Sequence, residues 1–311
     1  MARTLLELVK AFCNEVGITE PTQLFGSQND QEKQLISLAN REGKDFSKMA
    51  NKNGGWQELR KDYSFNTEIV AGLTGNTTAG SAVITNISST ASLSSGGVWG
   101  LTANGLTNPA FIVTVDSATQ ITVNQPFTES GTGIALTIGK VAYSMPSDFE
   151  YFVQRTFWDN KYKWELLGPI NAQEKQILRY GVVASGPRNK FYIRDNKMWL
   201  DPMPTESALI AYDYYSNAWC RSNASTVQTL WAADTDTYLL SEECFIEGMK
   251  WRFLRAKGLD YAEEKRSYDM ECERIISRDG GSRDLSLNSN GYSVQFLGDC
   301  NIQDGNFPSG V

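Results

Sequence analysis

Three pairs of acidic residues stand close enough in the chain to suggest acid–base chemistry. They are Glu242 and Glu243, Glu263 and Glu264, and Asp148 and Glu150. Paired carboxylates carry out glycoside hydrolysis when both face the same sugar. Neighbouring residues on a helix point about 100° apart, so neither glutamate pair converges on one substrate by itself. We therefore interpret the glutamates as solvated helix faces and Asp148 as a first-turn residue of a short helix.

The chain contains no histidine. This excludes Ser-His-Asp and Cys-His nucleophile pairs, a histidine general base and the usual zinc constellations. Gly96-Gly97 and Gly131-Thr132-Gly133 are not followed by a lysine and a helix, so they predict no phosphate loop. Asp234-Thr235-Asp236 resembles the opening of a calcium loop but lacks its glycine and terminal glutamate. The sequence predicts no catalytic residue, no cofactor site and no metal site.

Tryptophans could form a sugar platform, but most are dispersed over predicted hairpins and helices. These are Trp56, Trp158, Trp164, Trp199, Trp219, Trp231 and Trp251. Dispersed aromatic residues are more typical of cores and interfaces.

Composition narrows the class of protein. The 311 residues carry a formal net charge of -7, which argues against nucleic-acid binding as the main role. The five cysteines form no CxxC pair, so we expect free thiols in a reducing compartment. We find neither a signal peptide nor an apolar run long enough to span a membrane, and we expect synthesis in the cytoplasm.

Helical periodicity is strongest at the two ends of the chain. The spacing of apolar residues predicts a helix over 2–16 and a second one between Asn29 and Asn53. The stretch from Leu239 to Asp279 has the same period, and Ser241 is its expected N-cap. Gly258 leaves two alternatives open, one continuous rod or a hairpin of two helices. Because each N-terminal helix has one apolar stripe, we expect both to pack on the C-terminal helix.

The middle of the chain shows strand signals. Between Ala71 and Gly139 the charged residues are Asp116 and Glu129, and short β-branched runs alternate with turn residues. This pattern predicts a small all-β module inserted into a host domain. Beyond it we expect further strand and helix segments. These are a short helix over 146–153, hairpins over 156–167 and 191–200, a helix after Gly168, and a strand over 208–215.

The last residues, 281–311, are rich in glycine, serine and asparagine, with apolar side chains only at intervals. Such a segment is either a disordered tail or an arm that becomes ordered against another subunit. The alternation in Tyr292, Val294 and Phe296 favours the arm. The candidate contact residues are Leu285, Leu287, Tyr292, Val294, Phe296 and Phe307.

Several phrases together resemble the head-to-tail adaptor proteins of short-tailed phages. They are Leu5-Leu6-Glu7-Leu8-Val9 to Phe12-Cys13, Gln34-Leu35, Asn40-Arg41-Glu42-Gly43, Gly55-Trp56, Phe157-Trp158-Asp159, and Gly168-Pro169-Ile170 with Glu174. The resemblance covers about 1–70 and 140–280, and none of its motifs is diagnostic alone. The insert is similar to a small β module of phage tail and virion proteins, and compact adaptors lack it. We interpret it as a decoration of the outer rim or a contact to a neighbouring virion protein.

The resemblance implies a fold class and a function. The expected fold is α+β: a helical bundle core made of two N-terminal helices and a long C-terminal helix, with a β-hairpin region. An adaptor core (1–70 and 140–280), an inserted small all-β domain (71–139) and an extended C-terminal arm (281–311) are the expected domains. The expected function is structural: a virion protein that forms a dodecameric ring around the DNA exit channel.

The implied partners are copies of the chain itself, the portal protein above and the tail nozzle or tail tubular protein below. Genomic DNA would pass without sequence-specific binding, and an acidic lumen would let it slide. Two other functions remain open. One is a virion-associated cell-wall hydrolase, and the other is a tail module that binds host glycans through the insert.

Overall fold

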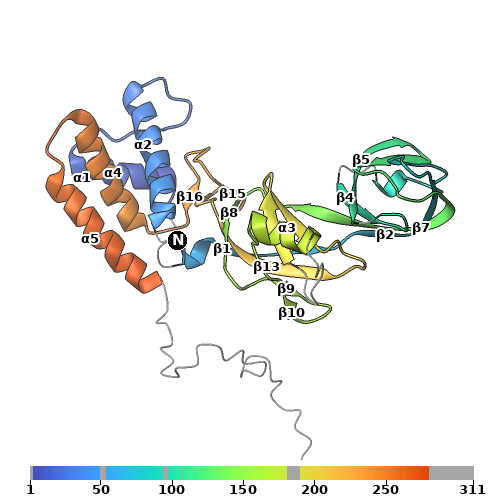
Figure 1. Ribbon diagram of the computed structural model, residues 1–311. Helices are drawn as coiled ribbons and strands as arrows, with labels where there is room; N and C mark the ends of the chain where they lie inside the picture. Colours follow the sequence, from blue (N-terminus) through green and yellow to red (C-terminus); the bar gives the residue numbers. More distant parts are fainter. Residues whose placement is uncertain (1–2, 50–53, 94–96, 107, 181–189, 280–311) are drawn as a thin grey trace, which may run out of the picture.

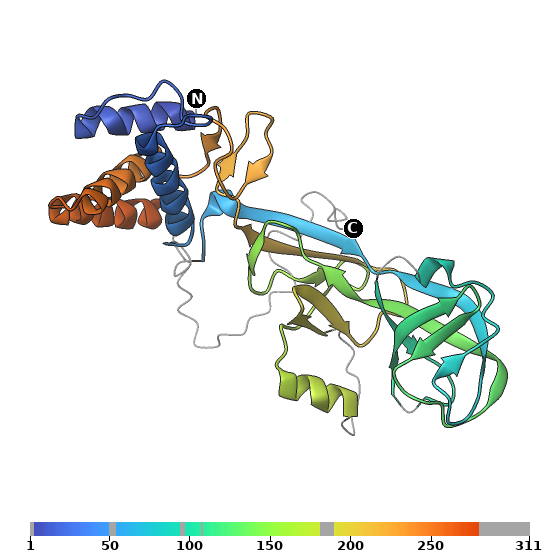
Figure 2. The same ribbon diagram turned by 90° about the horizontal axis from the view of Figure 1, so that it is seen from above.

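A computed structural model describes residues 3–49, 54–93, 97–106, 108–180 and 190–279. The molecule is elongated (Figure 1): helices gather at one end, a β unit occupies the other end, and further strands lie between them. Figure 2 shows long strands running from the middle of the molecule into the distal β unit.

Four helices form the helical end. They are α1 (Leu5–Val16), α2 (Asp30–Ser47), α4 (Glu242–Lys257) and α5 (Ala262–Asp279). Thr4 and Glu7 form a capping box at the start of α1, and Ser241 caps α4 as its sequence predicts. The chain reverses at Gly258, whose φ of 74° is left-handed. The long C-terminal helix of the expected fold is therefore wrong, and the hairpin of two helices, the other alternative, is what forms. Both α1 and α2 contact α4.

The predicted fold class is wrong. The described residues form sixteen strands in three antiparallel sheets and five α-helices, so the protein is strand-rich and does not consist of a helical bundle with a small β module. Many strands pair with partners far away in sequence, and several contain two residues, too few to show an alternating pattern. Helical periodicity is a local signal that the sequence shows, whereas long-range strand pairing leaves no comparable local signal.

The first sheet joins five strands from distant parts of the chain. They are β1 (Arg60–Asn66), β8 (Phe149–Phe152), β9 (Trp158–Asp159), β10 (Trp164–Glu165) and β13 (Leu209–Ser216). The short helix predicted over 146–153 does not exist. Its residues form β8, which pairs with β13. Phe149 packs on the ring of Tyr214 and Phe152 on the ring of Tyr212, and both tyrosines belong to β13.

The second sheet runs from the centre of the molecule to its far end. It contains β2 (Ile69–Thr77), β3 (Val83–Ile84), β4 (Val98–Thr102), β5 (Ala110–Ser117), β6 (Gln120–Val123), β7 (Gly131–Ser144), β11 (Lys190–Arg194) and β12 (Lys197–Asp201). The predicted insert has its own buried cluster, drawn from residues between Leu73 and Ile138. Its sheet nevertheless does not end at the insert boundary, because β7 pairs with β2 and β4 in the insert and with β12 beyond it.

The two larger sheets share a core rich in aromatic residues. The first sheet contributes Tyr212 of β13 together with Phe157, which directly precedes β9. The second sheet contributes Tyr143 of β7 and Phe191 of β11. The turn at Asp195-Asn196 has positive φ at both residues, so the hairpin predicted over 191–200 is confirmed. The helix predicted after Gly168 is α3 (Ala172–Tyr180), where Asn171 Oδ1 accepts a hydrogen bond from Glu174 N.

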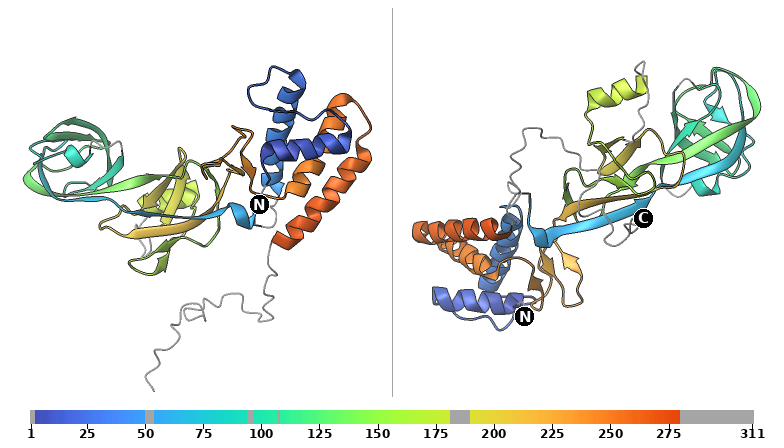
Figure 3. Two further views of the ribbon diagram at one scale, coloured as in Figure 1. Left: turned by 180° about the vertical axis from the view of Figure 1, so that it is seen from behind. Right: turned by 90° about the horizontal axis from the view of Figure 1, so that it is seen from below.

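The third sheet is small and lies between β13 and α4 in the chain. Its strands are β14 (Cys220–Arg221), β15 (Val227–Gln228) and β16 (Thr237–Tyr238). Trp219 and Trp231 from this region enter the helical core. Seen from behind, the small sheet lies where the helices meet the central strands (Figure 3). No helix among the described residues is long and apolar enough to cross a membrane.

Candidate functional site

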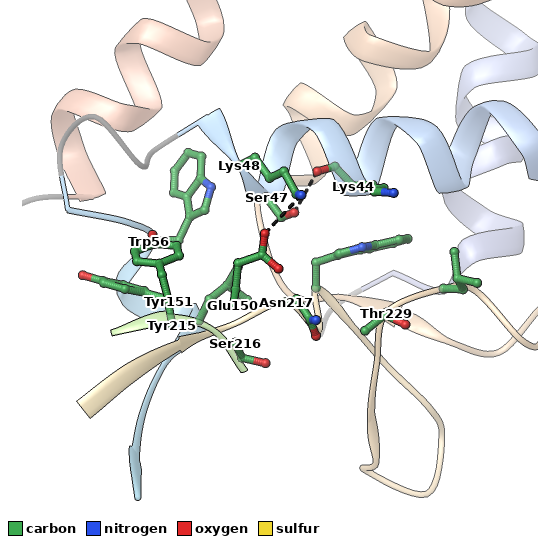
Figure 4. A pocket seen from close by; sticks show the side chains of 13 residues that line it. Lys44, Ser47, Lys48, Trp56, Glu150, Tyr151, Tyr215, Ser216, Asn217 and Thr229 are labelled. Atoms are coloured by element: carbon green, nitrogen blue, oxygen red, sulfur yellow. Dashed lines mark hydrogen bonds and ion pairs between the residues drawn. The ribbon is translucent and has the colours of Figure 1, made fainter. Parts of the chain in front are cut away.

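A pocket of about 380 Å³ opens where the helical end meets the first and third sheets. The C-terminal part of α2 forms one wall, and the ends of β8 and β13 form the opposite wall (Figure 4). The lining residues are Lys44, Ser47, Lys48, Trp56, Leu59, Glu150, Tyr151, Tyr215, Ser216, Asn217, Trp219, Thr229 and Leu230. We call this space the junction pocket.

Aromatic rings make much of the junction pocket's surface. Tyr151 and Tyr215 stack with their ring centroids 4.8 Å apart. The Trp56 indole is buried and donates a hydrogen bond of 3.0 Å to the carbonyl oxygen of Phe46, which fixes the ring against α2. Gly55 has a φ of 87°, and a Cβ there would lie 2.6 Å from Tyr215 Cε1. A glycine is therefore required where the chain enters the pocket.

Charged side chains stand at the pocket rim. Lys48 Nζ lies 3.1 Å from Glu150 Oε1, and both side chains are partly exposed. Lys44 is exposed, and no ion pair to it is found among the described residues. Leu230 is 57% exposed although it is aliphatic. A pocket with aromatic walls, an exposed leucine and two lysines suits a ligand that combines apolar groups with negative charge.

Asp148 links β1 and β13 near the pocket through its side-chain carboxylate. Its carboxylate accepts hydrogen bonds from Lys61 Nζ at 2.5 Å, from Ser216 Oγ at 2.7 Å and from the Tyr214 hydroxyl at 2.8 Å. Burial acts to raise the pKa of Asp148, but the hydrogen bonds from these three groups outweigh it, and the pKa lies below its ordinary value. The sequence interpretation of Asp148 as a first-turn helix residue is wrong.

The acidic pairs noted in the sequence do not converge. Glu242 binds Arg3 at 2.6 Å, whereas Glu243 lies 3.4 Å from Arg274. Glu263, in the first turn of α5, lies 4.0 Å from Arg266. Each of these three glutamates therefore lies next to an arginine side chain.

One pair of carboxylates that the sequence did not suggest does come together. Asp62 and Asp213 face each other across β1 and β13, in an open groove that Trp158 also lines. Burial raises the pKa of Asp213, and the charge and hydrogen bond of Asp62 raise it further. Carboxyl groups in hydrogen-bond contact leave no room between them for a sugar, because retaining glycosidases hold theirs about 5 Å apart.

The remaining sequence features have structural roles. Asp234 accepts hydrogen bonds from the backbone N–H groups of Leu24 and Phe25, and Asp236 accepts them from Ala232 and Ala233. In the part of the chain that the structure describes, no group of histidine, cysteine or acidic residues could hold a metal. The glycines 131 and 133 belong to β7, and residue 96 lies outside the described residues.

Most tryptophans are buried, as their dispersion suggested. Trp158 and Trp164 are the exceptions, 49% and 42% exposed on the β9–β10 hairpin. Tyr162 stacks on Trp164 with a centroid distance of 5.5 Å. The hairpin therefore presents an apolar surface to solvent. Within the described part of the insert, Val113 is the large apolar side chain that is exposed.

A buried ionic cluster in the helical core gave no sequence signal. Glu42 is fully buried, and its carboxylate accepts hydrogen bonds from Arg252 Nε at 2.6 Å and from the Tyr268 hydroxyl at 2.8 Å. Burial raises the pKa of Glu42 against the opposing effect of Arg252. The cluster ties α2 to both helices of the C-terminal hairpin.

The candidate arm contacts lie outside the described residues. These are Leu285, Leu287, Tyr292, Val294, Phe296 and Phe307. No family model and no curated protein matches the chain.

Proposed function

We propose that this chain is a structural virion protein, a head-to-tail adaptor that forms a ring between the portal and the tail nozzle. The observation that carries the proposal is the elongated body, with separate hydrophobic cores at its two ends and long strands between them. Such a body can present different surfaces to different neighbours. The sequence resemblance supplies the identity of those neighbours.

Two surface features support a role in assembly. The β9–β10 hairpin exposes Trp158, Tyr162 and Trp164, and exposed aromatic residues are enriched at protein interfaces. A closed ring requires that one surface of each copy docks on a different surface of the next copy. The hairpin and the junction pocket are two such different surfaces.

The alternatives have less support. A cell-wall hydrolase would need two carboxyl groups that flank a glycosidic bond, and the Asp62–Asp213 pair is too close for that. Glycan binding through the insert would need an exposed aromatic platform, and no large aromatic side chain is exposed in its described residues. Zymography on peptidoglycan and glycan arrays test these alternatives directly.

The test of the adaptor function is the mass of the purified protein, measured by light scattering alone and after mixing with the portal. We expect rings on the portal in negative-stain images of the mixture. A chain that lacks 280–311 should keep its helical circular dichroism but fail to assemble. No association of the intact, folded chain with the portal would refute the proposal.

A surface variant identifies the ring contact. Trp164→Ala removes an exposed side chain, so we expect the monomer to keep its unfolding midpoint while ring formation on the portal is weakened at least tenfold. Val113→Ala, at a residue that is 62% exposed, is the matched control and should assemble normally. Equal assembly by both variants would remove the hairpin from the interface.

A further inference from the structure

The end of the described chain lies beside the junction pocket. Asp279, the last residue of α5, accepts a hydrogen bond of 2.9 Å at Oδ2 from the backbone N–H of Gln57. Gln57 directly follows Trp56, whose ring lines the pocket. The segment 280–311 is therefore attached to the body at the edge of this pocket.

The composition of that segment is complementary to the pocket. It carries aromatic side chains at Tyr292, Phe296 and Phe307, and its acidic residues outnumber its single basic residue, Arg283. The pocket offers the stacked Tyr151 and Tyr215 rings, the exposed Leu230 and the two rim lysines. Apolar rings would bury the exposed leucine, and the acidic residues would lie near Lys44, because Lys48 is already paired with Glu150.

The attachment also favours the same chain as the occupant. The nearest of these aromatic residues, Tyr292, is 13 residues after Asp279. A binding segment tethered by a connection of this kind has an effective concentration of about a millimolar at its site. A segment of a second copy would have to compete at the micromolar concentrations of a purified protein. Binding within one chain is therefore favoured even where the intrinsic affinity is modest.

We propose that the junction pocket is a peptide-binding site that holds part of segment 280–311 of its own chain when the protein is free. This goes beyond the adaptor function and does not depend on it, because it concerns the isolated chain. In an assembly, the same segment would have to leave the pocket before it could contact another protein. In the free protein, the junction pocket would thus bind part of segment 280–311.

Photo-crosslinking in the full-length chain tests the proposal. Leu230 is replaced by p-benzoylphenylalanine, the protein is irradiated, and the linked peptides are identified by mass spectrometry. We expect a product of monomer mass in which the probe is joined to residues within 280–311. The matched control places the same probe at Val113, which is also exposed but lies in the distal β unit, and should give no such product.

Three results would overturn the proposal. They are cross-links only to other parts of the chain, a product of twice the monomer mass, and the same yield from the Val113 probe. The charge contribution is tested with Lys44→Glu, which should lower the cross-linking yield from the Leu230 probe several-fold. Lys33→Glu, an exposed lysine near the start of the same helix, should leave the yield unchanged. Equal yields from the two lysine variants would refute the charge complementarity on which the choice of occupant rests.

Discussion

Gly248→Ala tests whether the buried Glu42 cluster fixes the spacing between α2 and α4. Gly248 lies in the middle of α4 and faces the Glu42 carboxylate on α2. A Cβ at this position would lie within 2.5 Å of Glu42 Oε2, the atom that also accepts the hydrogen bond from Arg252. The carboxylate cannot move away without losing that bond, so an added methyl group has no low-energy solution.

The magnitude follows from two opposing contributions. Replacing a mid-helix glycine by alanine stabilises a helix by about 1 kcal/mol. Disrupting a buried ion pair costs about 3–5 kcal/mol, and overpacking alone costs about 1–3 kcal/mol. The steric and ionic cost exceeds the gain in helix propensity. We expect Gly248→Ala to lower the free energy of unfolding by about 2–4 kcal/mol.

Urea unfolding followed by tryptophan fluorescence measures this loss, and a double-mutant cycle identifies its cause. Glu42→Ala removes the atoms that the new methyl group would meet. In that background, Gly248→Ala should be neutral or slightly stabilising, because only helix propensity remains. Arg252 keeps a second partner, Asp45, at 3.1 Å, which helps the background variant to fold. An equal cost of Gly248→Ala in both backgrounds would refute the reasoning.

Three further predictions concern other parts of the structure. Because the pKa of Asp148 is lowered on folding, its contribution to stability is present above the ordinary pKa of about 3.9 and is lost as the pH falls through the folded value. Thermal unfolding of Asp148→Asn at several pH values should therefore show a smaller loss between pH 5 and pH 2 than the unsubstituted chain. Gly55→Ala would place a methyl group against Tyr215 at a residue with positive φ, so it should lower the free energy of unfolding in urea by about 2–4 kcal/mol. Gly72→Ala, at a positive φ with no neighbouring atoms, is the control and should lower it by about 1 kcal/mol. In a Cys300→Ser background, the four buried thiols should react with Ellman's reagent only after unfolding; rapid reaction of the native protein would contradict their burial.

Local signals predicted the helical end well. A capping residue acts within one turn, so Ser241 shows in the sequence where α4 begins. Gly258 left a rod and a hairpin equally open, because a glycine inside a helical pattern need not end the helix. The Asp195-Asn196 turn is equally local. The number of strands could not be predicted in this way. Residues 149–152 have no alternating pattern of their own. They form a strand because they pair with β13 and because Phe152 packs in the same aromatic cluster as Tyr212 and Tyr214 of β13.

The junction pocket could not be found from the sequence, for the same reason. Its lining comes from the end of α2, the Gly55-Trp56 turn, β8, and the region around β13 and β15, which are separated by long stretches of chain. No single stretch has a spacing that suggests a site. The acidic pairs drew attention because they are adjacent in sequence, whereas Asp62 and Asp213, which do meet, are far apart in it.

The long strand β7 matters for how the molecule would work as an adaptor. β7 is a single strand of 14 residues, about 45 Å long at 3.3 Å per residue, and it pairs with β2, β4 and β12. An insert joined through flexible linkers could be removed or could swing freely. This one is continuous with the sheet that forms the central aromatic core, where Tyr143 of β7 lies. The distal β unit is therefore connected to the centre of the molecule through backbone hydrogen bonds, so a contact made by the insert would be held by the same sheet as the central core.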